Sequence, residues 1–579
     1  MDQRTARHVA VTILSILGFL AGGAVATATE SLVCEQYLWG VHGEYARDAY
    51  NLLSVRLRNA AADPFRGVLR LQAPSASRFH IPVGHRAEIY VSPGASRWIQ
   101  FYVRGYEPGA LLELAAVGAA PWKHDIRVPT QATAATVVLV DESRAVQSPS
   151  LGAVLPVSLF PSSAAALESV ELIVLDFLPT WTDGQRRALI DWVGAGGVLH
   201  AYEGEDGLWP ALDEWFPGAA LGVAESESRR NDLDPQRQMT YGRGAVAWIA
   251  QSLRRLPRDD APTPIEVEED GFGAPRPWGA GDDPELQALL RLARPQPMWA
   301  FIYLLGLLLV VSLALQHRLT RVSSGFLVSK LALAATLALF SLLFFVLARP
   351  SPSGARLEAA GYARSVGPGR YEVEHKLAVW WYFGGLRTIG DETVGSLCSV
   401  TQTHLSTATT LCHDRGSELQ ADLPINSVQT LQQTSYQEGA ELVAGIAAYR
   451  ASGVENWRLL QLDLDLAGEF EPIQAAWVRY QEALYSLVAS GTPGRWSLGE
   501  RVGGEPPRGS PLSLLGAQDR VVAEYREDRA RFAERPEWRN TIDVYAYSES
   551  TVFLKHSEIP ARRQRLLIRA SASLPKEAK

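Results

Sequence analysis

The sequence predicts a multidomain protein of mixed α/β and all-β class, with a two-helix transmembrane hairpin and a β-rich C-terminal domain. Three observations support this fold class. Short alternating segments fill residues 35–128, continuous Val/Ile/Leu runs follow in residues 133–250, and two long apolar runs lie within Trp299–Ala348. Alternation is typical of strands with one solvated face, continuous apolar runs of strands buried on both faces, and runs of about 20 apolar residues of membrane-spanning helices.

Residues 1–29 have the pattern of an export signal. Arg4 and Arg7 form a basic start, Val9–Leu20 is an apolar core, and Ala26–Ala28 matches an A-x-A cleavage site. The apolar character continues up to Ala26, so the segment is either cleaved or kept as an anchor. Both versions place residue 30 outside the cytoplasm.

Composition excludes several function classes. The 579 residues carry a net charge of −8 and no Lys/Arg-rich run, so we expect no nucleic-acid partner. Three cysteines, Cys34, Cys398 and Cys412, cannot supply the paired Cys/His clusters of a zinc site. We expect neither a metal nor a cofactor.

Residues 30–130 are predicted to form a β-sandwich. Leu52–Leu57 and Gly67–Gln72 alternate apolar and polar positions, and the turn-rich Asn59–Pro64 separates them. Further short runs at similar spacing are punctuated by Pro and Gly, which is typical of sandwich strands.

Residues 131–255 are predicted to form an α/β domain. Thr136–Val140 and Glu171–Leu175 are continuous apolar runs of the kind found in parallel sheets. A Thr182-x-x-Gln185 capping box then begins a helix, which ends in the glycines of residues 194–197, and Val198–Tyr202 follows as the next strand. The order is that of a strand–helix–strand unit.

This stretch resembles the class I glutamine amidotransferase-like domains of bacterial envelope proteins. Those domains have a strand, a loop, a helix carrying Gln near its start and a Gly-Gly strand in the same order, and Tyr241–Gly244 resembles their closing Tyr-Gly-x-Gly. The resemblance implies a flavodoxin-like, amidotransferase-like α/β fold. The whole layout is similar to bacterial envelope membrane proteins that join an immunoglobulin-like domain, here residues 30–130, to such a domain and a membrane hairpin.

The amidotransferase chemistry is not expected here. A glutaminase of that class needs a cysteine on a tight Gly-x-Cys-x-Gly elbow, and no cysteine lies between Cys34 and Cys398. No Gly-x-Ser-x-Gly elbow replaces it. His200 and Glu203 at a strand end make only half a metal site. We therefore expect no catalytic residues.

Asp141 and Asp176 are the candidate ligand residues. Each follows one of two predicted parallel strands, and ligands of open α/β sheets bind beyond the carboxyl ends of the strands. The alternative is that both carboxylates only cap the loops that follow them.

Residues 256–296 are predicted to be an acidic Pro/Gly linker, with a short helix at Glu285–Ala293. Residues 297–349 are the predicted transmembrane hairpin. Its basic turn at 317–325 would face the cytoplasm, which places the large domains in the periplasm and the protein in the bacterial inner membrane.

Residues 350–579 are predicted to be β-rich and extracytoplasmic, with a charged helix at Gln518–Glu534 and a strand assigned to Ala475–Leu487. Cys398 and Cys412 flank a Ser/Thr-rich stretch, so an oxidising compartment would join them in a disulfide.

The leading functional hypothesis is a non-enzymatic envelope protein that binds protein partners or a ligand and contacts the lipid bilayer. Two alternatives stay open: an accessory subunit of a membrane transporter complex, and a hydrolase with an unconventional nucleophile.

Overall fold

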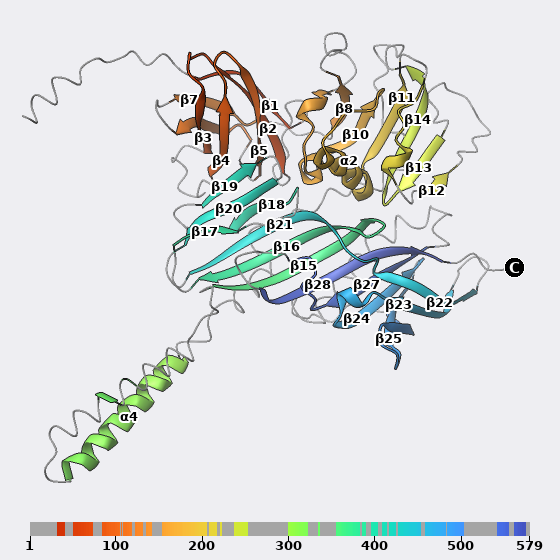
Figure 1. Cartoon of the computed structure of the whole chain (residues 1–579). Helices are drawn as coiled ribbons and strands as arrows, with labels where there is room; N and C mark the ends of the chain where they lie inside the picture. Colours follow the sequence, from red (N-terminus) through yellow and green to blue (C-terminus); the bar gives the residue numbers. More distant parts are fainter. Residues whose placement is uncertain are drawn as a thin grey trace, which may run out of the picture.

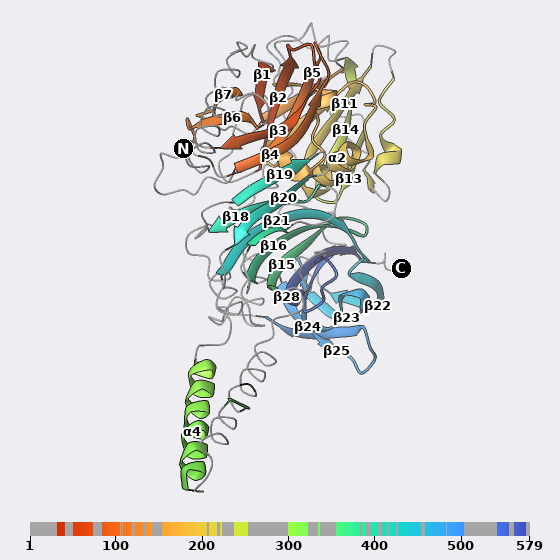
Figure 2. The same cartoon turned by 60° about the vertical axis from the view of Figure 1, so that its left-hand side comes forward.

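The computed structural model places three β-rich bodies together, and the helix α4 stands apart from them (Figures 1 and 2). The structure describes residues 32–40, 50–72, 84–104, 106, 108–117, 122–130, 135–141, 153–204, 208–216, 220–222, 237–252, 299–321, 334–335, 338, 355–381, 385–389, 395–402, 408–413, 416–423, 427–452, 458–481, 483–502, 541–554 and 561–574. The predicted export signal, the linker at 256–296 and the charged helix at Gln518–Glu534 lie outside the described residues.

The first body is a β-sandwich. Its smaller sheet has the order β1-β2-β5, with bounds Leu32–Trp39, Asn51–Asn59 and Ser96–Val103. Four strands of its larger sheet come from the same region: β3 (Phe65–Gln72), β4 (Gly84–Val91), β6 (Leu111–Val117) and β7 (Trp122–Arg127). Alternate residues of both sheets, such as Leu57 and Leu69, point into one shared core. The predicted strands of this region are confirmed.

Strands from the C-terminal half complete the larger sheet of the sandwich. Its order is β17-β20-β19-β4-β3-β6-β7, where β17 is Gly385–Ile389, β19 is Ala408–His413 and β20 is Gly416–Leu423. Strand β19 pairs in parallel with β4, with Thr410 opposite His85. The sequence before α4 and the sequence after it therefore build one sheet together (Figure 1).

The second body is a seven-stranded sheet in the order β12-β13-β14-β11-β10-β8-β9. Its bounds are β8 (Ala135–Val140), β9 (Ala153–Pro156), β10 (Val170–Leu175), β11 (Val198–Glu203), β12 (Ala220–Gly222), β13 (Arg237–Tyr241) and β14 (Gly244–Ser252). Strands β9, β8, β10, β11 and β14 run parallel, and β13 is antiparallel to both of its neighbours, β14 and β12. The helix α2 (Asp183–Ala195) connects β10 to β11, so the predicted strand–helix–strand unit is confirmed.

The flavodoxin-like fold class is wrong. A flavodoxin-like domain carries α-helices on both faces of its sheet, whereas the described chain is mostly strand and places only α2 on this one. The segment between β9 and β10 forms the short 3-10 helices η1 (Val157–Leu159) and η2 (Ala164–Leu167) instead of a crossover α-helix. A further 3-10 helix, η3 (Asp213–Trp215), follows β11, and the antiparallel β12–β13 pair closes the edge. The sheet is therefore parallel in part but not doubly wound.

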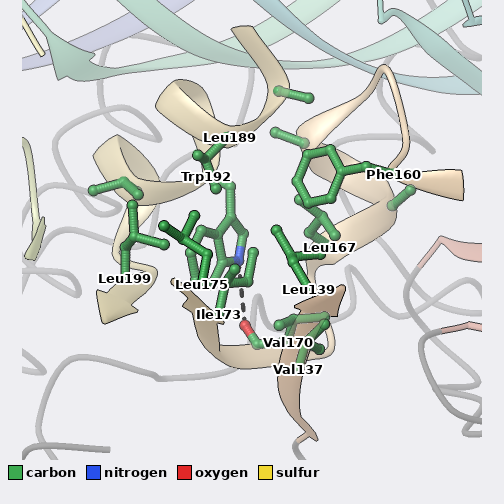
Figure 3. Packing of buried hydrophobic residues seen from close by; sticks show 14 of the residues in the cluster. Val137, Leu139, Phe160, Leu167, Val170, Ile173, Leu175, Leu189, Trp192 and Leu199 are labelled. Carbon is green, nitrogen blue, oxygen red and sulfur yellow. Dashed lines mark hydrogen bonds between the residues drawn. The ribbon is translucent and has the colours of Figure 1, made fainter. Parts of the chain in front are cut away.

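Helix α2 packs on the sheet through one apolar face. Leu189 and Trp192 are buried against Leu139, Ile173 and other strand residues (Figure 3). The indole Nε1 of Trp192 donates to the carbonyl of Val170 at 3.2 Å, which satisfies the buried polar atom of this side chain.

The third body is an eleven-stranded sheet, which we call the long sheet. Its order is β18-β21-β16-β15-β28-β27-β24-β25-β26-β23-β22. The bounds are β15 (Ala355–Gly367), β16 (Arg370–Trp381), β18 (Leu397–Gln402), β21 (Ser427–Glu438), β22 (Val443–Ser452), β23 (Arg458–Leu466), β24 (Ile473–Tyr480), β25 (Ala483–Ala489), β26 (Arg495–Arg501), β27 (Thr541–Ser548) and β28 (Ala561–Ser573), with η6 at Gly468–Phe470. The β-rich C-terminal prediction is confirmed, including strands within Ala475–Leu487.

The long sheet curls so that distant strands share one core. Val373 of β16 and Leu464 of β23 belong to the same buried cluster, although many strands separate them in the sheet order. Tyr371 helps to close this curl, because its hydroxyl accepts from the backbone N–H of Leu442 at 2.9 Å.

The predicted transmembrane hairpin at 297–349 is wrong. No helix among the described residues has the length and apolar character needed to cross a bilayer. Helix α4 (Trp299–Arg321) continues past the apolar run into Gln316–Arg321, where the basic turn was expected. Of the second apolar run, only residues 334–335 and 338 are described. The inner-membrane location and the periplasmic assignment built on that hairpin are corrected accordingly.

Candidate functional site at the two edges of the parallel sheet

The parallel sheet has two chemically different edges. The starts of β11 and β14 face the long sheet, because the glycines beside them contact Val366 of β15. The opposite edge, where β8 and β10 end, lies away from that contact. We call the side of the sheet where β11 and β14 start the docked edge, and the side where β8 and β10 end the open edge.

Glycines make the close approach at the docked edge possible. A Cβ atom on Gly194 would lie 2.1 Å from the carbonyl oxygen of Val366, and one on Gly242 would lie 2.3 Å from the same oxygen. A Cβ on Gly244 would lie 2.0 Å from the carbonyl oxygen of Val193. Any side chain here would collide with backbone, so the Gly-Ala-Gly-Gly and Tyr-Gly-Arg-Gly motifs build a surface onto which β15 packs.

Helix α2 joins the two edges and is capped differently at each end. At the open edge Thr182 and Gln185 form the predicted capping box, with reciprocal side-chain to backbone hydrogen bonds. At the docked edge the helix ends at Gly196, whose φ of 129° favours glycine. The guanidinium of Arg243 donates to the carbonyl of Ala195, so a positive charge lies at the negative end of the helix dipole.

A buried ion pair ties α2 to the long sheet. Nε and Nη2 of Arg370 donate to the two carboxylate oxygens of Asp191, each at 2.8 Å. Nη1 of Arg370 also contacts Glu438 at 3.0 Å. Burial raises the pKa of Asp191 and outweighs the opposing effect of Arg370. Such a bidentate pair fixes orientation, and it leaves a costly buried charge when one partner is removed.

A second polar group lies beside this pair on the long sheet. Arg364 pairs with Glu372, and the hydroxyl of Tyr436 donates to the same carboxylate at 3.2 Å. Burial alone would raise the pKa of Glu372, but Arg364 and Arg243 outweigh it and the pKa is lowered. Burial together with the charge of Glu372 raises the pKa of Tyr436.

The β-sandwich and the residue Gly395, just before β18, also contact the second body, through the segment between β9 and β10. Gln100 of β5 donates to the carbonyl of Leu159 at 2.8 Å, and the hydroxyls of Tyr102 and Ser162 lie 3.0 Å apart. Ser163 donates to the carbonyl of Gly395 at 2.7 Å. The parallel sheet is therefore held from two sides.

Asp141 and Asp176 lie at the open edge. Each is the residue directly after its strand, and β8 and β10 are adjacent, with Val138 opposite Val174. Both carboxylates are half-buried and both have interactions within the chain. The strand register brings the two ends together at the position where open parallel sheets bind ligands.

Apolar side chains are exposed near the same edge. Leu178 follows β10, and Leu208 and Trp209 follow β11; all three are exposed. The indole Nε1 of Trp209 donates to the carbonyl of Ile249 at 3.0 Å, which fixes the ring. Exposed apolar side chains that include a fixed aromatic ring make a surface suited to contact with another molecule.

His200 is not placed for catalysis. It is fully buried in the middle of β11, 6.4 Å from the ring of Tyr202, and no donor or acceptor among the described residues reaches either of its ring nitrogens. Burial lowers the pKa of His200 to about 4, so the imidazole is neutral at pH 7. Glu203, three residues later, lies at the open edge with Asp176, and no group of three metal-binding side chains occurs within the described ranges.

The two cysteines predicted to form a disulfide are free thiols in the structure. Cys398 lies on β18 of the long sheet and Cys412 on β19 of the sandwich. The Sγ of Cys412 lies 4.0 Å from Nδ1 of His85. Burial raises the pKa of Cys412 to about 12 and lowers that of His85 to about 4, so both are neutral and the pair has no nucleophilic character.

Comparisons with known proteins identify no family for this chain. No family model and no curated protein matches the chain. Among solved structures, the chain is similar to a cycloisomaltooligosaccharide glucanotransferase of Paenibacillus sp. complexed with cycloisomaltoheptaose, at 13% identity and a TM-score of 0.16. That match covers 29% of this chain and 27% of the other. A similarity of this size carries no argument about fold or function.

Local sequence patterns predict the residues of the open edge but not those that hold the docked edge. Arg370, Arg364 and Glu372 lie far along the chain from α2, and nothing in their spacing connects them to it. The glycines of this edge are part of the motifs that carry the resemblance to amidotransferase-like domains. A cluster of glycines at the end of a helix and at the start of a strand was the available signal for a close backbone contact.

Proposed function

We propose that this protein is a non-catalytic binding protein whose open edge takes up a partner or ligand. The observation that carries the proposal is the division of the parallel sheet: one edge is fixed to the long sheet through glycines and a buried ion pair, and the other presents carboxylates and exposed apolar side chains. A surface held so rigidly loses little conformational freedom when it binds.

The chemistry of the region supports binding over hydrolysis. Residues 131–255 contain no cysteine and one histidine, His200. A general base must reach the reacting group, and His200 is buried in mid-strand. The described residues that directly follow β8, β10 and β11 include no histidine to form a nucleophile–base pair with Asp141 or Asp176.

The first experiment tests the absence of catalysis. The purified full chain is incubated with glutamine, and ammonia release is compared with the buffer background. We expect no release above background, since the covalent route through a thioester needs the missing thiolate. Release that disappears in the Asp176→Asn variant would overturn the non-catalytic assignment.

The second experiment tests which edge binds. A photo-crosslinking residue replaces Asp176 at the open edge, and a control carries it at Glu171, at the opposite end of the same strand. We expect a discrete crosslinked product in cells only from position 176. Products from position 171 alone, or from neither position, would contradict binding through the open edge.

A further inference from the structure

Two chain segments lie side by side at the open edge. Residues 176–185 follow β10, and residues 203–219 begin with the last residue of β11. The ring of Trp181 in the first segment lies 5.9 Å from the ring of Trp215 in the second. Trp181 is also stacked on Phe160 at 4.3 Å. A row of packed rings therefore holds the two segments together.

Both segments are acidic. Together, residues 176–185 and 203–219 contain seven Asp and Glu residues and no Lys or Arg. Asp141, directly after the adjacent strand β8, adds a carboxylate to the same edge. The next cation along the chain, Arg186, is already paired with Asp183 at 2.9 Å. Carboxylates gathered on one edge create a negative potential that attracts cations, and we call the described part of the two segments the acidic surface.

Apolar side chains belong to the acidic surface as well. Leu178, Leu208 and Trp209 are 44%, 66% and 37% exposed. The indole of Trp209 is fixed by its hydrogen bond to the carbonyl of Ile249. The backbone N–H of Gly204 donates to the carbonyl of Leu208 at 2.9 Å, which closes the intervening loop. A fixed indole face can accept a cation, and a loop that is already closed loses little freedom on binding.

We infer, on the basis of the proposed function, that the partner of the open edge is a basic protein segment in which apolar side chains separate Arg or Lys residues. Arginine matches this surface in two ways, since its guanidinium pairs with carboxylates through two hydrogen bonds and also stacks on an indole. Apolar side chains between the cations would cover Leu178 and Leu208. Nucleic acids and phosphate headgroups carry the wrong charge for this edge.

A designed peptide tests the chemistry of the partner on the full chain. The probe is a dye-labelled peptide of alternating Arg and Leu, and its control has Glu in place of Arg. We expect fluorescence anisotropy to show binding of the basic probe alone, with an affinity that falls as salt is added, because salt screens charges near the surface. Trp209→Ala should weaken this binding about fivefold, since the cation–π contact is lost. Absence of binding by the basic probe would refute a basic partner.

Two exposed residues of β4 in the sandwich serve as matched controls. Tyr90→Ala removes an aromatic ring that is 50% exposed, and Glu88→Gln removes an exposed carboxylate. Both should leave the affinity unchanged, and a loss equal to that of Trp209→Ala would show attraction to the whole molecule instead of the acidic surface. Should Trp209→Ala fail to fold, Glu203→Gln combined with Glu214→Gln decides. Neither of these glutamates is buried, and their loss must weaken both the binding and its salt dependence.

Two outcomes would count against a basic partner without removing the open edge as a binding surface. A crosslink from position 176 in cells, with no binding of the basic probe, would keep the proposed function and refute a basic partner. Probe binding that strengthens in the double variant Arg254→Glu with Arg255→Glu would assign the acidic surface to the chain's own basic residues after β14, and would refute an external basic segment.

Discussion

The docked edge and the open edge of the parallel sheet differ in their residue types. At the docked edge the sequence removes side chains, with Gly194 and Gly242 allowing backbone to touch backbone, and it adds one bidentate ion pair. At the open edge it keeps side chains that are expensive to bury in a core, Asp141 and Asp176, together with the exposed Trp209. The difference indicates that one edge is for internal assembly and the other for external contact.

The largest effect should come from breaking the ion pair at the docked edge. Arg370→Ala leaves the carboxylate of Asp191 buried without its guanidinium, which we expect to cost about 4 kcal/mol in the free energy of unfolding. Denaturant unfolding measures the loss. The double variant Asp191→Asn with Arg370→Ala should recover part of it, and an unrecovered loss would show that packing of the arginine stem matters more than its charge.

The glycine contact should come next. Gly194→Val places a branched side chain against the Val366 carbonyl, and we expect a loss of about 3 kcal/mol because backbone must move. Gly468→Ala is the control, since a Cβ there meets nothing within 4 Å. Equal losses in the two variants would mean that the close approach has no special weight.

Between the two edges, His200 should make the sheet sensitive to acid. Its pKa is lowered by burial to about 4, below the ordinary value of 6.5, so the unfolded chain binds the proton first. Stability is therefore fully present above about 6.5 and falls as pH drops towards 4, by about 3 kcal/mol in all. Comparing acid denaturation of the wild type and His200→Leu measures this, and superimposable pH profiles would contradict it.

At the open edge a change in the cap of α2 should have the smallest effect. Thr182→Ala removes the capping box and should cost about 1 kcal/mol. Because the docked end of α2 is fixed independently, we expect thermal unfolding to shift only slightly. A loss as large as that of Arg370→Ala would indicate that the two ends of the helix are not independent.

Local sequence patterns predicted local structure well. The capping box at Thr182–Gln185, the continuous apolar strands and the alternating strands of the sandwich all depend on neighbours within a few residues. Asp141 and Asp176 were located for the same reason, since each follows its own strand directly.

Local patterns do not predict which strands pair when they lie far apart in the sequence. Nothing near β19 shows that it will pair with β4, more than 300 residues earlier, because any exposed strand edge presents the same backbone groups. Cys398 and Cys412 show the same limit, since they were predicted to flank one local hairpin but lie on strands of different sheets.

The flavodoxin-like class and the membrane hairpin were wrong because each rested on one kind of pattern. Parallel strands do not fix which faces of a sheet receive helices, and the segment at 157–167 forms only 3-10 turns. An apolar run likewise does not fix where its helix ends, and α4 extends into the basic segment that was predicted to be a turn.

The most direct test of the division between the edges is hydrogen exchange of the full chain carrying Gly194→Val, compared with the wild type at one pH. If the glycine contact holds the parallel sheet to the long sheet, the C-terminal half of α2 and the β15–β16 turn will lose protection together. Strands β6 and β7, which lie far from the contact in the sandwich, will keep theirs. Loss of protection in α2 with an unchanged β15–β16 turn would contradict a docked edge.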